Sequence, residues 1–225
     1  MYQRWRFLTF LHWRYDPSAI EKLLPSQVTL DTFDGSAWIG LTPFLLTDLR
    51  PPFLPSLPHI SHFPETNVRT YVRGPDGERG VWFFTLEADR LAAVMGARLL
   101  YRLPYRWAAM RVTVSDTAIQ YRSARKRLFG SAQTRIEVAP GDRLSVSDFD
   151  NFLTARYRLY TLVGRRLGYA QIDHEPWPLQ TGRLVGLDQN LIERSGVPAP
   201  AGAPILHYSA DLTVRIGRLR LAEPS

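Results

Sequence analysis

The sequence contains no cysteine, which excludes disulfide bonds, thiolate metal ligands and a cysteine nucleophile. A chain without cysteine is typical of a reducing compartment, so we expect a cytoplasmic protein. Lysine is scarce as well, because 26 of the 28 basic residues are arginine. Lys22 and Lys126 are therefore the only side-chain amines that could condense with a carbonyl compound.

The sequence also lacks a long hydrophobic run. Its longest apolar stretch, 38–46, is interrupted by Gly40, Thr42 and Pro43 and is too short to span a bilayer. Arginines precede a short apolar run at 7–11, but no small-residue cleavage site follows. We therefore interpret the N-terminus as a strand rather than a secretion signal, and we expect no membrane partner.

Familiar sequence motifs for nucleotide binding and hydrolysis are missing, since the chain contains no GxGxxG, GxxxxGK[ST] or GxSxG. His59 and His62 lie in the proline-rich segment 50–64, which predicts a long loop where helical spacing has no meaning. No HExxH motif is present, so we expect no metal centre and no cofactor. The five histidines are scattered along the chain: His12, His59, His62, His174 and His207.

The arginine excess gives a formal net charge of +7, which favours anionic partners of any kind, nucleic acid included. Arginines alternate with aromatic residues in RWRF, YRLPYRW and RYRLY, a pattern found where bases stack on a protein. It also arises in amphipathic strands, where arginine stems cover apolar surface. We interpret the basic run RSARKR (122–127) as a solvated strand end, and without a recognisable binding module we do not favour nucleic acid.

Strand patterns dominate the chain. Apolar side chains at odd positions from Trp5 to Tyr15, with Arg4, Arg6 and His12 at even positions, predict a strand with one buried face. Further strands are expected within 28–46 (two strands joined at the Asp34-Gly35 turn) and at 65–73, 81–88, 110–121 (a hairpin), 157–163, 169–174 and 206–221, the last with a bulge at Gly217. Helices are expected near 17–24, 88–100, 148–155 and 187–195, those at 17–24 and 148–155 capped by Asp16 and Ser147.

We find no internal repeat and no linker, so residues 1–225 are expected to form a single domain. Three or four short helices among about ten strands predict an α+β protein that is rich in β-structure. Such a chain builds a β-barrel or a β-sandwich with helical inserts.

The stretch FPETNVRTYVR (63–73) carries the strongest candidate chemistry. Strand alternation places Glu65, Asn67 and Arg69 on one face and Thr66 and Val68 on the other. Taken alone, the polar face fits a solvent-exposed surface, and the alternative is the lining of a pocket. A similar choice applies to His174 in YAQIDHEPWPL, which fits a core histidine bonded to backbone or a neutral imidazole at a cavity rim.

Seven stretches, whose order covers nearly the whole chain, carry a family resemblance. The stretches are RWRFLTFLHWRYDP, LDTFDGSAWIGLTPF, FPETNVRTYVR, GVWFFTLEAD, GARLLYRLPYRWAAM, FLTARYRLYT and HEPWPL. Together they resemble the bacterial YqjF-like family of unknown function, and that family resembles the acetoacetate decarboxylase-like superfamily. The resemblance implies a β-barrel with a central cavity, flanked by extra sheet and by three to four short helices.

In the decarboxylases, a tract resembling G-R-E-x-x-G-F-P-K-K carries the imine-forming lysine and the lysine that lowers its pKa. On ARLLYRLPYR, Arg98 matches the arginine and Pro104 the proline. Leu99 replaces the glutamate, and Tyr105 and Arg106 replace the two lysines. Because neither a phenol nor a guanidinium forms an imine, we do not expect imine-based decarboxylation.

The superfamily also places an acidic residue on a strand that lines the cavity, and FPETNV resembles that motif with Glu65 at the acid. The resemblance implies that Glu65, Asn67 and Arg69 face inward. Glu65 would then be an acid or base, Tyr105 and His174 would orient or polarise a carbonyl, and arginines would clamp an anion. The candidate ligand-binding residues are Asn67, Arg69, Arg98, Arg106 and Trp177.

Three classes of function remain open at this point. The first is a protein that binds a small anionic or carbonyl-bearing metabolite without chemistry. The second is a lysine-free lyase, hydratase or isomerase that uses Glu65 as acid or base. The third is a binder of nucleic acid or another anionic surface, which requires arginines on an outer face and binding that weakens with salt. Edge strands and the basic charge permit a homo-oligomer without requiring one.

Overall fold

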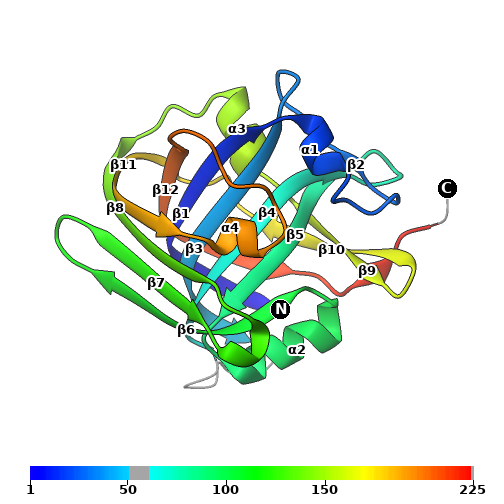
Figure 1. Ribbon diagram of the computed structural model, residues 1–225, viewed down its shortest axis with the longest axis horizontal. Coiled ribbons are helices and arrows are strands. Elements are labelled where there is room, and N and C mark those ends of the chain that lie inside the picture. The colour runs from blue at the N-terminus through cyan, green and yellow to red at the C-terminus, as the bar shows by residue number, and fades with distance from the viewer. Residues whose placement is uncertain (51–60, 224–225) are drawn as a thin grey trace.

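The computed structural model describes residues 1–50 and 61–223, and Figure 1 shows a strongly curved sheet with short helices at its margins. The segment 51–60, which contains His59, lies outside the described residues. The strands are β1 (Tyr2–Tyr15), β2 (Thr29–Leu30), β3 (Ala37–Arg50), β4 (Phe63–Arg73), β5 (Arg79–Ala88), β6 (Tyr105–Val114), β7 (Ile119–Arg125), β8 (Gln133–Arg143), β9 (Arg158–Val163), β10 (Arg166–His174), β11 (Gln180–Gln189), β12 (Ile205–Ile216) and β13 (Arg220–Leu221). The helices are α1 (Pro17–Glu21), α2 (Leu91–Tyr101), α3 (Asp148–Thr154) and α4 (Leu191–Arg194), with a 3₁₀ turn at Arg127–Phe129.

Strand pairing closes the sheet on itself twice. Strands β5, β4, β3, β1 and β12 pair in that order and form a shared wall. Strands β9 and β10 connect β5 back to β12 on one side of this wall. Strands β6, β7, β8 and β11 make the same connection on the other side. These rings of paired strands are consistent with the predicted barrel and flanking sheet.

Each side of the shared wall covers its own apolar core. The first core, on the β9–β10 side, includes Phe10, Phe44, Tyr71, Leu153 and Trp177. The second core, on the β6–β8 side, combines other side chains of the same wall with side chains of β7 and β8. They include Leu11, Ile39, Val68, Ile136 and Tyr208.

Strand β1 does not keep one parity. Phe7 has a positive φ of 51°, and the β1–β3 register shifts between Arg6 and Leu11. This irregularity rotates the following residues by one position, so even-numbered side chains then face the first core. His12, which we expected on a polar face, is 0% exposed. The prediction that all even-numbered side chains of this strand lie on one polar face was wrong.

Helix α2 also differs from expectation. It begins at Leu91 rather than at residue 88. Helical spacing places Leu91, Val94 and Met95 on one face, but only one of these side chains is buried in the core. Val94 is buried, whereas Leu91 and Met95 are 43% and 56% exposed. None of the helices in the described part of the chain is long and apolar enough to cross a membrane.

Other differences arise from long-range pairing. The Asp34-Gly35 turn is present with positive φ at both residues, but β2 pairs with β4 rather than with β3. Strand β12 ends at Ile216, so Gly217 marks a strand end rather than a bulge, and β13 pairs with β10. Strands β8 and β11 were not predicted, and residues 187–189 belong to β11 rather than to helix α4.

Candidate functional site

The polar face of β4 lies inside the molecule. Glu65, Asn67 and Arg69 are 4%, 3% and 6% exposed, because β4 pairs on both edges and apolar cores cover both of its faces. The alternate residues Thr66 and Val68 are buried as well. Of the two readings that the sequence allowed for this face, the structure shows the pocket lining.

This face borders a small cavity of about 50 Å³, enough for roughly three or four water molecules. Apolar side chains line the rest of the cavity, among them Trp5 on β1 and Trp177 after β10. The polar part of the lining includes Glu65, Asn67, Arg69, Tyr105, Arg156 and His174. An enclosed space with a few convergent polar groups is the usual form of a small-molecule site.

Glu65 and Tyr105 form a hydrogen-bonded pair in this lining. The Tyr105 hydroxyl donates to Oε2 of Glu65 over 2.9 Å, and Asn67 provides a second hydrogen bond to the carboxyl. Burial raises the pKa of Glu65 to about 7, against the lowering effect of these two hydrogen bonds. Burial and the neighbouring carboxylate also raise the pKa of Tyr105. Glu65 therefore exchanges a proton near neutral pH, as a general acid or base must.

Arg69 places a buried guanidinium beside the cavity. Its Nη2 donates to the Leu153 carbonyl oxygen over 3.3 Å, and its Nε has no hydrogen-bond partner. The guanidinium carbon lies 5.2 Å from the centre of the Phe10 ring. Among the described residues, no carboxylate lies within ion-pair distance of Arg69. A buried cation without an anion is costly, so the site is electrostatically suited to an anionic ligand.

Arg156, which sequence reasoning missed, is a second buried arginine in the lining. Its Nη1 lies 2.9 Å from Oδ2 of Asp31, while Nε and Nη2 have no hydrogen-bond partner. Burial lowers the pKa of Arg156 to about 10. The residue occurs within FLTARYRLYT, one of the stretches that carries the family resemblance. That resemblance could have pointed to this stretch, but no local pattern in it showed that Arg156 rather than Arg158 would line the cavity.

The rings of His174 and Trp177 pack against each other at the edge of the cavity, tilted by 43° with their centres 4.5 Å apart. The Nδ1 of His174 lies 2.6 Å from the Glu175 carbonyl oxygen, and burial lowers the pKa of the imidazole. Trp177 donates from Nε1 to the Thr154 carbonyl oxygen over 3.0 Å. His174 is thus half-buried, bonded to backbone and part of the lining, which combines features of both sequence-based readings.

The carboxyl end of helix α3 holds two of the lining side chains, Arg69 and Trp177, and the buried Tyr71 next to them. The Leu153 carbonyl accepts from Arg69 and from Tyr71, and the next carbonyl accepts from Trp177. Tyr71 also contacts Nε2 of His12, a buried histidine whose pKa is lowered by desolvation and then by Arg69. These carbonyls have no partner within the helix, so they are available to hold the site.

Two predicted ligand-binding residues lie away from the cavity. Arg106 follows Tyr105 on β6, and because neighbouring strand residues point to opposite faces, it points away from the lining. Burial and the nearby Arg98 and Arg125 lower the pKa of Arg106. The Arg98 guanidinium lies 5.3 Å from the Phe129 ring centre. The prediction that Arg98 and Arg106 clamp the cavity ligand is therefore corrected.

The two lysines are also distant from the lining. Lys22 is exposed directly after α1, and Nζ of Lys126 lies 5.4 Å from the centre of the Trp107 ring. Neither residue belongs to the cavity lining. Tyr105, which stands at a lysine position of the decarboxylase tract, does face the cavity.

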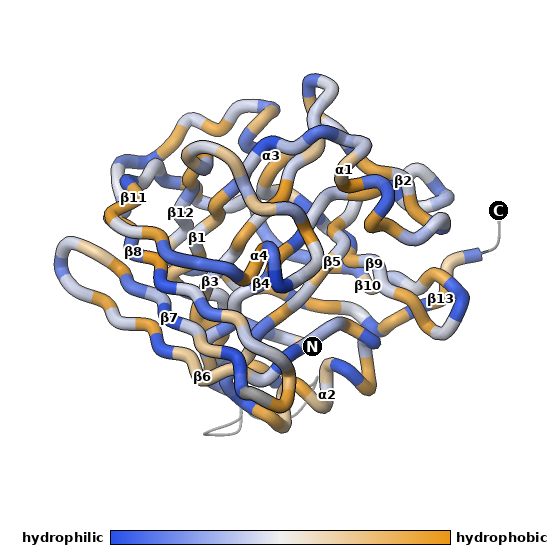
Figure 2. The backbone as a smooth tube through the Cα atoms, in the orientation of Figure 1, coloured by the Kyte–Doolittle hydropathy of each residue, from blue (hydrophilic) through white to orange (hydrophobic). Residues whose placement is uncertain are grey.

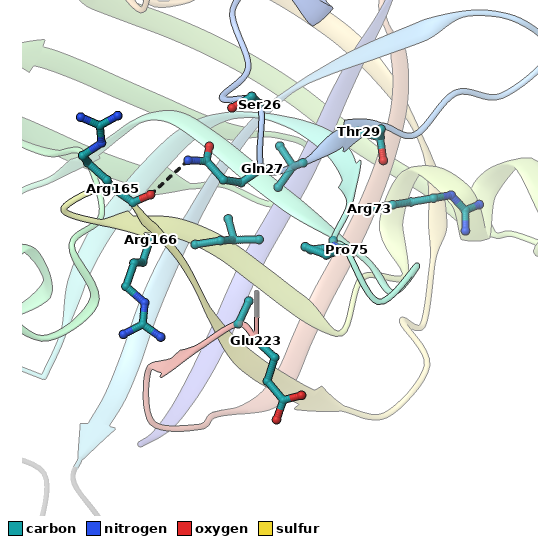
Figure 3. A pocket seen from close by; sticks show the side chains of 12 residues that line it. Ser26, Gln27, Thr29, Arg73, Pro75, Arg165, Arg166 and Glu223 are labelled. Atoms are coloured by element: carbon teal, nitrogen blue, oxygen red, sulfur yellow. Dashed lines mark hydrogen bonds between the residues drawn. The ribbon is translucent and has the colours of Figure 1, made fainter. Parts of the chain in front are cut away.

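A larger surface pocket of about 460 Å³ lies between residues 26–29, 73–75 and 165–167 (Figure 3). Its arginines do not converge, because the side chains of Arg165 and Arg166 extend in opposite directions (Figure 3). Arg73 is engaged with Asp31, 2.9 Å away. Size alone therefore does not make this pocket the better candidate site.

Comparison with known proteins places the chain in a family. The model of DUF2071, described as an uncharacterized conserved protein, matches residues 2–213. The chain belongs to the DUF2071 family. It is also 40% identical over 227 residues to YqjF of Bacillus subtilis strain 168, covering 98% of this chain and 91% of that one.

Solved structures share the fold at much lower identity. An acetoacetate decarboxylase from Legionella pneumophila has a TM-score of 0.68 and 15% identity, over 97% of this chain and 86% of that chain. The enduracididine biosynthesis enzyme MppR, complexed with pyruvate, has a TM-score of 0.69 and 15% identity, over 98% and 89%. An acetoacetate decarboxylase-like enzyme from Sphingomonas wittichii has a TM-score of 0.67 and 14% identity, over 99% and 92%. The chain thus has the acetoacetate decarboxylase-like fold that its sequence predicted.

Proposed function

We propose that this protein binds a small anionic metabolite with a carbonyl group in the cavity beside β4, without forming an imine. One observation carries the proposal: Arg69 is 6% exposed, lacks a carboxylate partner in the described residues, and borders a partly enclosed cavity. A bound carboxylate would supply the missing counter-charge. The pyruvate complex of the fold neighbour MppR supports this ligand class.

The unpartnered atoms of the lining define how such a ligand would be held. Nε of Arg69 and Nε and Nη2 of Arg156 are donors without partners, and Oδ1 of Asn67 is an acceptor without one. Two arginines can bind a carboxylate through charge-assisted hydrogen bonds. The Glu65–Tyr105 pair would then lie near the carbonyl end, with Trp177 forming an apolar wall.

Thermal unfolding with a set of small acids and ketones tests the proposal. Pyruvate, 2-oxobutyrate and acetoacetate should raise the melting temperature, whereas acetone and sodium chloride at equal concentration should not. Arg69→Met keeps the apolar stem over Phe10 but removes the charge, so it should abolish the shift. Arg165→Met, at an exposed turn, is the matched control and should retain it. Equal stabilisation by acetone, or a full shift in Arg69→Met, would contradict the proposal.

A second candidate function is acid–base catalysis on the bound carbonyl compound. The observation that favours it is a buried carboxyl with a pKa of about 7, hydrogen-bonded to Tyr105. Such a group can remove a proton from the carbon next to a carbonyl. NMR in deuterated water should then show deuterium entering the C3 position of pyruvate, and Glu65→Gln should stop the exchange while leaving the thermal shift intact. Ligand binding without exchange would leave a binding protein.

A further inference from the structure

The positive charge of the chain is concentrated in one segment. Residues 98–143 contain ten basic and three acidic residues, so this segment carries a net charge of +7, the whole formal charge of the protein. The rest of the chain is balanced. The segment covers the last residues of α2 and strands β6, β7 and β8, the green strands at one side of Figure 1. Arg125 in this segment is buried in an ion pair with Glu87, and the remaining segregated charge points to an anionic partner at that face.

Three arginines form a row across these strands. Arg111 on β6 is directly opposite Arg122 on β7, and Arg122 is directly opposite Arg135 on β8. All three side chains are exposed, and in the described residues none takes part in an ion pair. Like charges that face each other across strands destabilise a sheet. An anion laid along the row would relieve that repulsion.

The arginine row, defined as Arg111, Arg122 and Arg135, lines a surface groove of about 480 Å³. Two small side chains form part of the groove floor, since Ala109 and Ala124 face each other beside the row, and Gln133 follows them on β8. Hydrophilic and hydrophobic residues alternate along β7 and β8 (Figure 2). Exposed and buried positions alternate with them, so the arginines share the outer face while apolar residues cover the second core.

The shape of the row selects among anionic partners. Neighbouring strands are about 4.8 Å apart, so the row is a line of three cations rather than a broad patch. A line of charge over a groove with a low floor fits a linear polyanion. A lipid surface would instead be met by protruding apolar side chains. Those of this segment lie outside the groove: Leu99, Leu100, Val114 and Leu128. Asp188 on β11 pairs with Arg135 in register and ends the row on that side.

We propose that the arginine row binds the phosphate backbone of single-stranded nucleic acid, without base preference. The groove contains no aromatic side chain on which a base could stack, so the contacts are to phosphates alone. This site is separate from the cavity and does not depend on the cavity ligand.

Fluorescence anisotropy with a labelled 12-nucleotide oligothymidine tests the row. Three phosphate contacts predict a slope of about −2 in a plot of log affinity against log salt concentration, which is a fall of about 20-fold between 50 and 200 mM salt. The triple variant Arg111→Gln, Arg122→Gln, Arg135→Gln should bind at least about 10-fold more weakly, with a slope near zero. Its melting temperature should equal or exceed that of the wild type, because repulsion has been removed.

The matched control removes the same charge elsewhere. Arg165, Arg166 and Arg194 are exposed and form no ion pair in the described part of the chain. Their triple glutamine variant should bind oligothymidine within about twofold of the wild type. Equal losses in both variants would show a bulk charge effect and overturn the proposal. Binding of phosphatidylglycerol vesicles or polyglutamate, with no binding of oligothymidine, would overturn it as well.

Discussion

At the scale of single residues, the central feature is that Glu65 and Arg69 share a buried strand face without forming an ion pair. The two residues are four positions apart on β4, with Asn67 between them on the same face. Strand geometry therefore keeps the two side chains from forming an ion pair. Glu65 is stabilised in its neutral form by burial, and Arg69 is left as an unpaired cation. Separated charges of this kind are costly to the fold and are useful for binding.

The raised pKa of Glu65 predicts a pH dependence of stability. Its pKa is about 7 in the folded protein against an ordinary 4.5, so the folded state binds the proton more tightly. This stabilisation is fully present below pH 4.5 and is lost as the pH rises through 7. Between pH 5 and 8, the free energy of unfolding of the wild type should fall by roughly 2–3 kcal/mol relative to Glu65→Gln. Urea unfolding across this range measures it, and parallel curves for the two proteins would refute it.

At the scale of elements, the site depends on close approach between strands β1, β3 and β4. Gly40 on β3 lies opposite both His12 on β1 and Arg69 on β4. A Cβ at Gly40 would lie 3.1 Å from Nε2 of His12 and 3.4 Å from Cγ of Arg69. Because both neighbours are buried, this glycine makes the space in which the cavity arginine is packed.

Two glycine-to-alanine variants should therefore have opposite effects. Gly40→Ala should lower the free energy of unfolding by about 1–3 kcal/mol, since His12 and Arg69 cannot move away without disturbing the core. Gly96→Ala in helix α2 has nothing within 4 Å of the new Cβ and should raise it by about 0.5–1 kcal/mol. Chemical denaturation of both variants compares them directly. A Gly40→Ala protein as stable as the wild type would show that the packing at this crossing is loose.

At the scale of the whole molecule, the fold of a decarboxylase-like enzyme is combined with a cavity that has no amine. The chain covers nearly the full length of its structural neighbours, yet Lys22 and Lys126 lie outside the lining. Under the proposed function, a ligand in this cavity would be held by hydrogen bonds and charge rather than by an imine.

Reductive trapping tests whether either native lysine forms an imine in the intact protein. Incubation with pyruvate and sodium cyanoborohydride should add no mass to Lys22 or Lys126 beyond that seen after unfolding in urea, as measured by peptide mass spectrometry. The Tyr105→Lys variant supplies the contrast, because it introduces an amine facing the cavity. A specific adduct on either native lysine would contradict the imine-free site.

Much of the fold and part of the site followed from local sequence. The helix caps at Asp16 and Ser147 and the Asp34-Gly35 turn were correctly placed, because these depend on a few neighbouring residues. Strands β8 and β11 were missed, since their partners come from distant parts of the chain. Arg156 was missed for the same reason, because only long-range packing brings it beside β4.

The sequence by itself determined which side chains of β4 share a face, since strand alternation is a local property, and it limited the side-chain amines that could form an imine to two lysines. Tertiary structure decided that this face points inward, that Arg156 joins it, and that Arg98 and Arg106 do not. The physical reason is closure of the sheet. Pairings such as β5 with β9 and β10 with β12 set its curvature, and the curvature determines which face of each strand becomes the inside.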